Sequence, residues 1–230
     1  MAAARVFFEQ ELNELNGQLI TMAKQVDEAI GRVIDAFRSR DGEAAKAVIA
    51  GDRTVNDMEK SIETKSLSLI LRQQPVAKDL RIISTALKVV TDMERIGDHA
   101  ADIAELVLRL FAMDEKAEKA GEQRSRMIQH IPQMADAARG MVHDAVEAFI
   151  AMDVDSAQEI IARDDVVDNL FNQVKEDIIN DLKAGTVSAD YCIDYLMIAK
   201  YLERIGDHAV NICEWTQFHE TGSLQNVRLL

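Results

Sequence analysis

A twelve-residue segment that occurs twice is the feature that most limits the fold of this 230-residue chain. Residues 94–105 read ERIGDHAADIAE and residues 203–214 read ERIGDHAVNICE, identical at nine of twelve positions, including the first seven. Two unrelated helices would not share such a block by chance, so we infer that one structural unit has been duplicated.

Apolar residues recur at spacings of three and four in both halves of the chain, which is the pattern of amphipathic helices. Ten glycines and two prolines leave few helix breakers. The sequence therefore predicts an all-α fold of two tandem three-helix bundles, six helices in total, related by the internal repeat. The predicted helices cover about residues 8–39, 43–72 and 75–113, then a segment from about 127, one that ends at Lys183, and 189–218.

These helices divide the chain into four parts. We expect the first repeat at residues 1–113, a linker or exposed helix end at 114–126, the second repeat at 127–218 and a loose tail at 219–230. The linker and the tail are inferred from composition, because residues 114–126 are polar and the last dozen residues show no period.

The chain is acidic, with a formal net charge of −14 at pH 7 and no cluster of Lys and Arg. Nucleic-acid binding needs a basic surface that neutralises phosphate, so DNA and RNA are not expected partners. An acidic protein is better suited to binding cations, or basic patches on another protein.

The N-terminus and the cysteines indicate a cellular location. The first residues reach Glu9 before any apolar stretch of signal-peptide length develops, and no run of eighteen apolar residues occurs. Cys192 and Cys213 lie in helical patterns of a chain too large to need a disulfide. We therefore predict a cytoplasmic protein with reduced cysteines that does not span a membrane by itself.

The repeated block places a stripe of acidic side chains on its helix. At about 100° per residue, four side chains fall within about 80° of one another: Glu94, Asp98, Asp102 and Glu105. Apolar residues of the block lie on the opposite side, so the carboxylates face away from the core of their own unit. The second copy keeps the stripe with one amide: Glu203, Asp207, Asn211 and Glu214.

The preceding helix of each unit carries a companion stripe. In the first unit, four side chains fall within about 60° of one another: Asp52, Asn56, Glu59 and Glu63. In the second unit, Asp164 and Asp168 stand at the matching offset. The match then weakens, because the two glutamates are replaced by Phe171 and Lys175.

Two interpretations of these stripes remain open. They could be solvated helix faces, although like charges at i,i+4 repel by about 0.2–0.5 kcal/mol per pair and ordinary surfaces intersperse Lys and Arg. Carboxylate and amide oxygens on two facing helices could instead bind Mg²⁺, Mn²⁺, Ca²⁺ or iron.

Each block also contains a histidine and a glycine. We expect His99 and His208 to pack or hydrogen-bond at the edge of the stripe, behind the metal ligands. Gly97 and Gly206 each cost a helix interior about 1 kcal/mol relative to Ala, which indicates that another backbone approaches closely there.

Sequence motifs of catalysis are absent. None of the five histidines has a Glu three residues earlier, as a ferritin-like di-iron site requires. Walker A, G-x-G-x-x-G, HExxH and G-x-S-x-G sequences do not occur. Composition and periodicity leave three classes open: a metal store, a helical adaptor and a metal-dependent phosphate-ester hydrolase.

The paired ERIGDHA blocks, the DxxxN and DxxxD spacings before them and the segment RQQPVAKDLR at residues 72–81 are similar to the PhoU family. The similarity covers about residues 8–218 and implies two three-helix bundles side by side, usually in a homodimer, without catalytic residues. It also implies a cytosolic negative regulator that keeps phosphate-starvation genes off when phosphate is plentiful. Such a regulator contacts the ATPase subunit of the phosphate-specific ABC transporter and a sensor histidine kinase at the inner membrane.

The resemblance also implies metal ions, because some relatives hold multinuclear clusters on surface carboxylates of the E/D-x-x-x-D type. Carried onto this chain, these pairs are Glu94 with Asp98, Glu203 with Asp207, Asp52 with Asn56, and Asp164 with Asp168. Glu59 and Asp102 complete the predicted ligand set, and Mg, Mn, Fe or Zn are the expected metals. Asn56 departs from the acidic pattern, so the first cluster should hold fewer ions or hold them more weakly.

Overall fold

The computed structural model describes residues 2–119, 128–224 and 227–228, which form seven helices and one short hairpin. The first unit contains α1 (Ala2–Ser39), α2 (Gly42–Gln73) and α3 (Lys78–Lys119). The second contains α4 (Ile131–Ala151), α5 (Val154–Ile161), α6 (Asp164–Ala184) and α7 (Ala189–Thr221). Strands β1 (Ser223–Leu224) and β2 (Val227–Arg228) pair antiparallel after α7.

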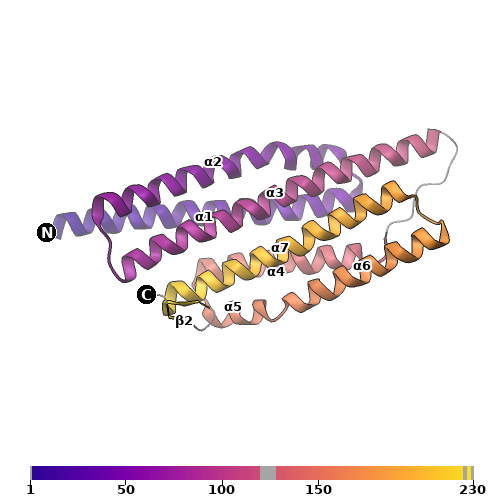
Figure 1. The fold of residues 1–230 in the computed structure, drawn as a ribbon. Coiled ribbons are helices and arrows are strands. Elements are labelled where there is room, and N and C mark those ends of the chain that lie inside the picture. Colours follow the sequence, from indigo (N-terminus) through magenta and orange to yellow (C-terminus); the bar gives the residue numbers. More distant parts are fainter. Residues whose placement is uncertain (1, 120–127, 225–226, 229–230) are drawn as a thin grey trace.

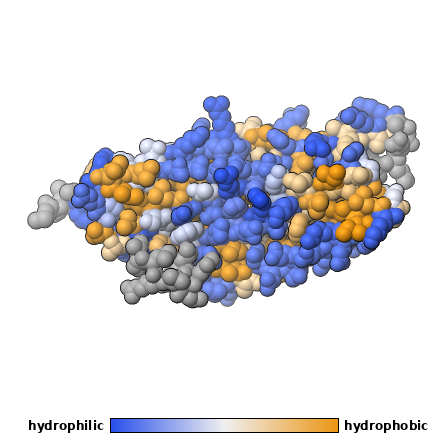
Figure 2. Space-filling model, in the orientation of Figure 1, coloured by the Kyte–Doolittle hydropathy of each residue, from blue (hydrophilic) through white to orange (hydrophobic). Residues whose placement is uncertain are grey.

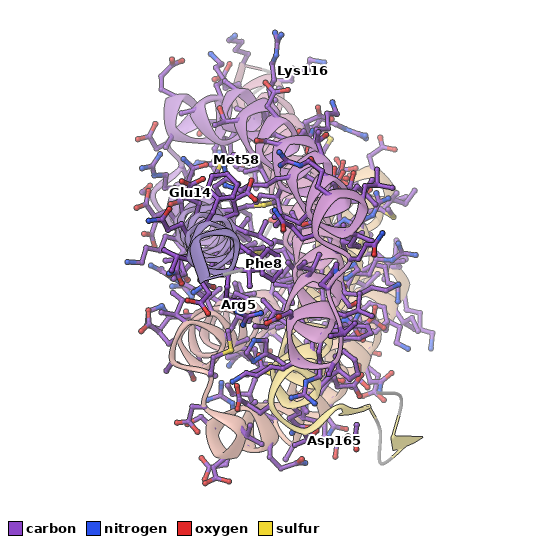
Figure 3. The ribbon with its side chains drawn as sticks, turned by 90° about the vertical axis from the view of Figure 1, so that its left-hand side faces the viewer. Arg5, Phe8, Glu14, Met58, Lys116 and Asp165 are labelled. Atoms are coloured by element: carbon purple, nitrogen blue, oxygen red, sulfur yellow. The ribbon has the colours of Figure 1, made fainter. Side chains whose placement is uncertain are left out.

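The two units are helical bundles that lie side by side along a common long axis (Figure 1). Helices α3 and α7 run antiparallel through the middle and form the most extensive contact between the bundles, and α1 also contacts α4. Viewed end-on, Arg5, Phe8 and Glu14 mark α1 in the upper bundle, and Asp165 marks α6 in the lower bundle (Figure 3). The predicted all-α fold of two repeated bundles is confirmed.

The predicted apolar stripe of the first helix forms the core of its bundle. Five of its residues are at most 4% exposed: Leu15, Leu19, Met22, Val26 and Val33. Burying such side chains is the main stabilising contribution to a helical bundle. No helix in the described part of the chain is both long and apolar enough to cross a membrane.

The same kind of N-cap follows the first helix of each unit. Asp41 Oδ1 accepts hydrogen bonds from two backbone amides at the start of α2, each at 3.0 Å. Asp153 Oδ1 accepts the equivalent pair at the start of α5, each at 3.1 Å. These bonds satisfy amides that the first helical turn leaves without an intrahelical partner. The duplication has therefore preserved the turn chemistry as well as the apolar pattern.

The second unit differs from the prediction because its middle helix is broken. The segment expected as one helix ending at Lys183 forms α5 and α6, separated at Ala162 and Arg163. Arg163 pairs with Asp144 of α4 at 2.7 Å, which anchors the break to the neighbouring helix. As a result, Asp164 lies in the first turn of α6.

Helix ends also differ from the predicted boundaries. Helix α3 continues to Lys119, so residues 114–119 of the segment predicted as a linker or an exposed helix end are a helix end. Asp114 stabilises this extension because its buried carboxylate accepts a hydrogen bond from Tyr191 Oη at 2.9 Å and pairs with Arg40 at 2.6 Å.

In the second unit, the described part of the fourth helix begins at Ile131, with a proline in its first turn. Helix α7 extends to Thr221, and the hairpin follows, so the segment predicted as a loose tail begins inside a helix. Residues 120–127, 225–226 and 229–230 lie outside the described residues.

Candidate metal-binding clusters

The first cluster consists of the predicted ligand residues on α2 and α3: Asp52, Asn56, Glu59, Glu94, Asp98 and Asp102. All six are partly buried. A Cβ atom on Gly97 would lie 3.1 Å from Val55 Cγ1, so the glycine allows α2 and α3 to approach closely, although its neighbour is a side chain and not the backbone that was predicted. This close approach brings the acidic stripes of the two helices together.

The carboxylates of the first cluster repel one another. Burial and the nearby Asp98 and Glu59 carboxylates raise the pKa of Glu94 to about 7. Burial and Asp98 also raise the pKa of Asp52, and burial and Glu63 raise the pKa of Glu59. Ionising these carboxyls is therefore unfavourable unless a cation compensates their charge.

Protein groups provide only part of this compensation. Arg95 lies at the rim, with Nη1 3.2 Å from Asp98 Oδ2 and Nε 3.5 Å from Glu94 Oε2. Asn56 donates a hydrogen bond to Asp52 Oδ2 at 3.0 Å. Three buried oxygens of the cluster have no hydrogen-bond partner: Asp52 Oδ1, Asn56 Oδ1 and Glu94 Oε2. Since buried polar atoms are normally satisfied, these oxygens fit a cation ligand set.

The second cluster consists of the predicted ligands on α6 and α7: Asp164, Asp168, Glu203 and Asp207. A Cβ atom on Gly206 would lie 3.4 Å from Asp164 Oδ1, so α6 also packs closely on the glycine of the repeated block. Burial and the Asp168 and Asp207 carboxylates raise the pKa of Asp164 to about 6. Asp168 and Asp207 are exposed, which makes this cluster more open than the first.

The ten predicted ligands thus gather in two clusters, five carboxylates and one amide in the first and four carboxylates in the second. In the described part of the chain, no three His, Cys, Asp or Glu side chains are arranged as a metal-binding group. The oxygen ligands, three of which are buried without a hydrogen-bond partner, fit a hard cation in chemical type. Metal binding stays a prediction.

The two repeated histidines face each other between the bundles, an arrangement that the sequence did not predict. The His99 and His208 ring centroids are 5.8 Å apart. His208 Nδ1 lies 2.8 Å from Asp92 Oδ1 of α3, and His99 stacks on Tyr201 of α7 at 5.2 Å. His99 Nδ1 also lies 3.5 Å from Asp102 Oδ2, so it does reach the edge of the acidic stripe. These rings therefore join the two units.

Comparison with known proteins assigns the family. The PhoU domain matches this chain twice, at residues 19–107 and 131–216. The chain belongs to the PhoU family. The phosphate-specific transport system accessory protein PhoU homolog of Clostridium acetobutylicum is 36% identical over 219 residues, 95% of this chain and 96% of that protein. The PhoU homolog 1 of Thermotoga maritima is 34% identical over 94% of this chain and 90% of its own length.

Solved PhoU structures share the fold. The crystal structure of the phosphate transport system regulatory protein PhoU from Streptococcus pneumoniae matches with a TM-score of 0.83 and 29% identity, covering 94% of this chain and 98% of that chain. PhoU from Pseudomonas aeruginosa matches with a TM-score of 0.84 and 27% identity, covering 94% and 100%.

The PhoU assignment selects one of the three classes that composition left open. PhoU proteins are accessory or regulatory proteins of phosphate transport and are not enzymes. The prediction of a PhoU-family accessory protein that is not an enzyme is confirmed, and the hydrolase alternative is set aside.

Proposed function

We propose that this protein is a negative regulator of the phosphate-starvation response that also modulates phosphate uptake. It acts in the cytoplasm as a homodimer, and it reaches the inner membrane by contacting the ATPase subunit of the phosphate-specific ABC transporter and its sensor histidine kinase. The observation that carries this proposal is the match of both units, over nearly the whole chain, to phosphate-specific transport accessory proteins.

The surface carries exposed apolar side chains and a negative net charge, and both support docking to a partner protein. On the face shown in Figure 2, hydrophilic side chains cover the middle and apolar side chains gather toward both ends. Exposed apolar side chains include Leu67 and Leu71 near the end of α2, and Ile179 and Ile193 near the junction of α6 and α7. The net charge of −14 favours a basic partner surface and predicts association that weakens with salt.

The two clusters complete the proposal as sites for divalent or multinuclear metal ions of Mg, Mn, Fe or Zn. The support is the raised pKa of Glu94 and Asp164 and the three buried oxygens of the first cluster that have no hydrogen-bond partner. A bound cation would neutralise the carboxylates. In each cluster, oxygens from two neighbouring helices would then bind the same metal ion. The ion would hold α2 to α3 in the first cluster and α6 to α7 in the second.

Deleting the gene tests the regulatory role. We expect phosphate-starvation genes to be switched on in phosphate-rich medium, because nothing then holds the kinase in its repressing state. Measuring the transcripts with and without a plasmid copy of the gene provides the control. Normal repression in the deletion strain would contradict the proposal.

A pull-down with purified ATPase subunit and kinase tests the contacts directly. We expect binding to both at low salt, with less protein retained as salt is raised, because charge attraction is screened within about 10 Å at 0.1 M salt. Failure to retain either partner at low salt, with Mn²⁺ present, would reject the contact mechanism and leave the family assignment intact.

A further inference from the structure

One position distinguishes the two clusters more sharply than any other. Three residues before the repeated block, the first unit has Thr91 and the second has Lys200. Thr91 Oγ1 donates a hydrogen bond at 3.3 Å to the carbonyl of Leu87 within its own helix. Lys200 instead extends its ammonium into the second cluster, where it pairs with Glu203 Oε2. Both copies keep the arginine of the block, but only the second unit adds a lysine three residues before the block.

The surroundings of Lys200 hold its side chain over the cluster. Its ammonium lies 5.5 Å from the centroid of the Phe171 ring, and Lys175 approaches the same ring at 4.8 Å. Phe171 occupies the position that corresponds to Glu59 in the first unit, so an aromatic ring has replaced a carboxylate. The Lys200 charge also opposes the rise in the pKa of Asp207 that burial and Glu203 cause. The second cluster thus has fewer carboxylates than the first, and its Glu203 already pairs with a lysine at a position where the first unit has Thr91.

We propose that Lys200 is a tethered cation that occupies the second cluster, so that a divalent ion binds the first cluster before the second. Binding at the second cluster requires the ammonium to leave Glu203. This inference rests on the proposed metal binding. From Asn56 alone, the first cluster would be expected to bind metal more weakly than the second. The proposal reverses this order, because a positively charged ammonium repels a metal ion, whereas the neutral Asn56 amide does not.

Mn²⁺ titration of the tag-free protein tests the proposal, with free Mn²⁺ measured by its electron paramagnetic resonance signal. In the wild type we expect two classes of site, the weaker at the second cluster. Lys200→Thr installs the residue of the first unit and should tighten the weaker class about tenfold, the effect of removing one neighbouring like charge at a solvent-facing site. Adding Asp207→Asn to this variant should remove the gain.

The reciprocal change provides the matched variant. Thr91→Lys should weaken the tighter class about tenfold, because it places the same ammonium one turn before the first cluster. Lys46→Thr is the control, since Lys46 also pairs with a Glu three residues away, at 2.7 Å, but on α2 outside both clusters. It should leave both classes unchanged.

Thermal melting tests whether Lys200 acts through its charge or only through packing. Metal-free Lys200→Thr should melt below the wild type, and Mn²⁺ should raise its Tm by more than that of the wild type. Unchanged Mn²⁺ affinity in both Lys200→Thr and Thr91→Lys would overturn the inference and leave the proposed metal binding standing. Absence of Mn²⁺ binding in the wild type and in Lys200→Thr would overturn both.

Discussion

The two bundles meet along two seams that differ in burial. The central seam joins α3 to α7 and contains two buried carboxylates: Asp194, 1% exposed, pairs with Arg109 at 2.9 Å, and Asp114, 5% exposed, accepts a hydrogen bond from Tyr191 at 2.9 Å. The outer seam joins α1 to α4 through more exposed ion pairs. These are Arg38–Asp136 at 2.7 Å, Arg139–Asp35 at 3.1 Å and His143–Asp27 at 3.0 Å.

The difference shows that contacts of the same chemical type contribute unequally to holding the two units together. Water can replace the partner of an exposed charge, so an exposed ion pair is worth little. Water cannot easily reach Asp194 or Asp114, so each depends on the partner that the other bundle or the neighbouring helix supplies. We infer that the central seam sets the register of the two units and that the outer seam adds little to it.

Of the substitutions that compare the two seams, Arg109→Ala should reduce the stability of the protein most. It leaves the carboxylate of Asp194 buried without its cation, and burial already raises the pKa of that carboxyl against the influence of Arg109. We expect the free energy of unfolding in urea to fall by about 2–3 kcal/mol.

The matched variant on the outer seam is Arg139→Ala, which removes the same side chain from an exposed pair. Here we expect a loss of at most about 0.5 kcal/mol. If the two variants lose equal stability, the distinction between the seams is wrong.

Tyr191→Phe should have an intermediate effect. It removes one hydrogen bond to Asp114, but Arg40 still pairs with that carboxylate at 2.6 Å. We expect the free energy of unfolding to fall by about 1 kcal/mol. Tyr191→Phe in an Arg40→Ala background should cost more, because Asp114 then loses both partners; strictly additive losses would show that they do not act on the same carboxylate.

The smallest effect should be a pH dependence confined to the outer seam. The hydrogen bond to Asp27 raises the pKa of His143, so the folded state binds its proton more tightly than the unfolded state. The stabilisation is therefore complete below the unfolded pKa near 6.5 and is lost as the pH rises through the folded value. The stability difference between wild type and Asp27→Asn, measured by urea unfolding, should shrink as the pH rises above about 6.5. A stability difference that grows as the pH rises would show that the hydrogen bond to Asp27 does not raise the pKa of His143.

Several features of the fold and of the candidate site follow from the sequence because they depend on neighbours along one helix. The apolar period defined the core of the first helix, and Asp41 and Asp153 start their helices by bonding amides two and three residues away. The acidic stripe of the block required only the helical period. The contact between this stripe and the stripe of the preceding helix could be predicted because consecutive helices pack together.

Other features were decided by contacts between distant parts of the chain, which no local pattern encodes. The break at Ala162 and Arg163 contains neither Gly nor Pro, and Arg163 pairs there with Asp144 of α4. His208 bonds to Asp92, which lies outside the repeated block and 116 residues away. The helical period gives the direction of a side chain from its own axis, but not which helix lies in that direction. Only the antiparallel packing of α3 on α7 therefore decided that the repeated histidines join the two units and that Asp194 is buried.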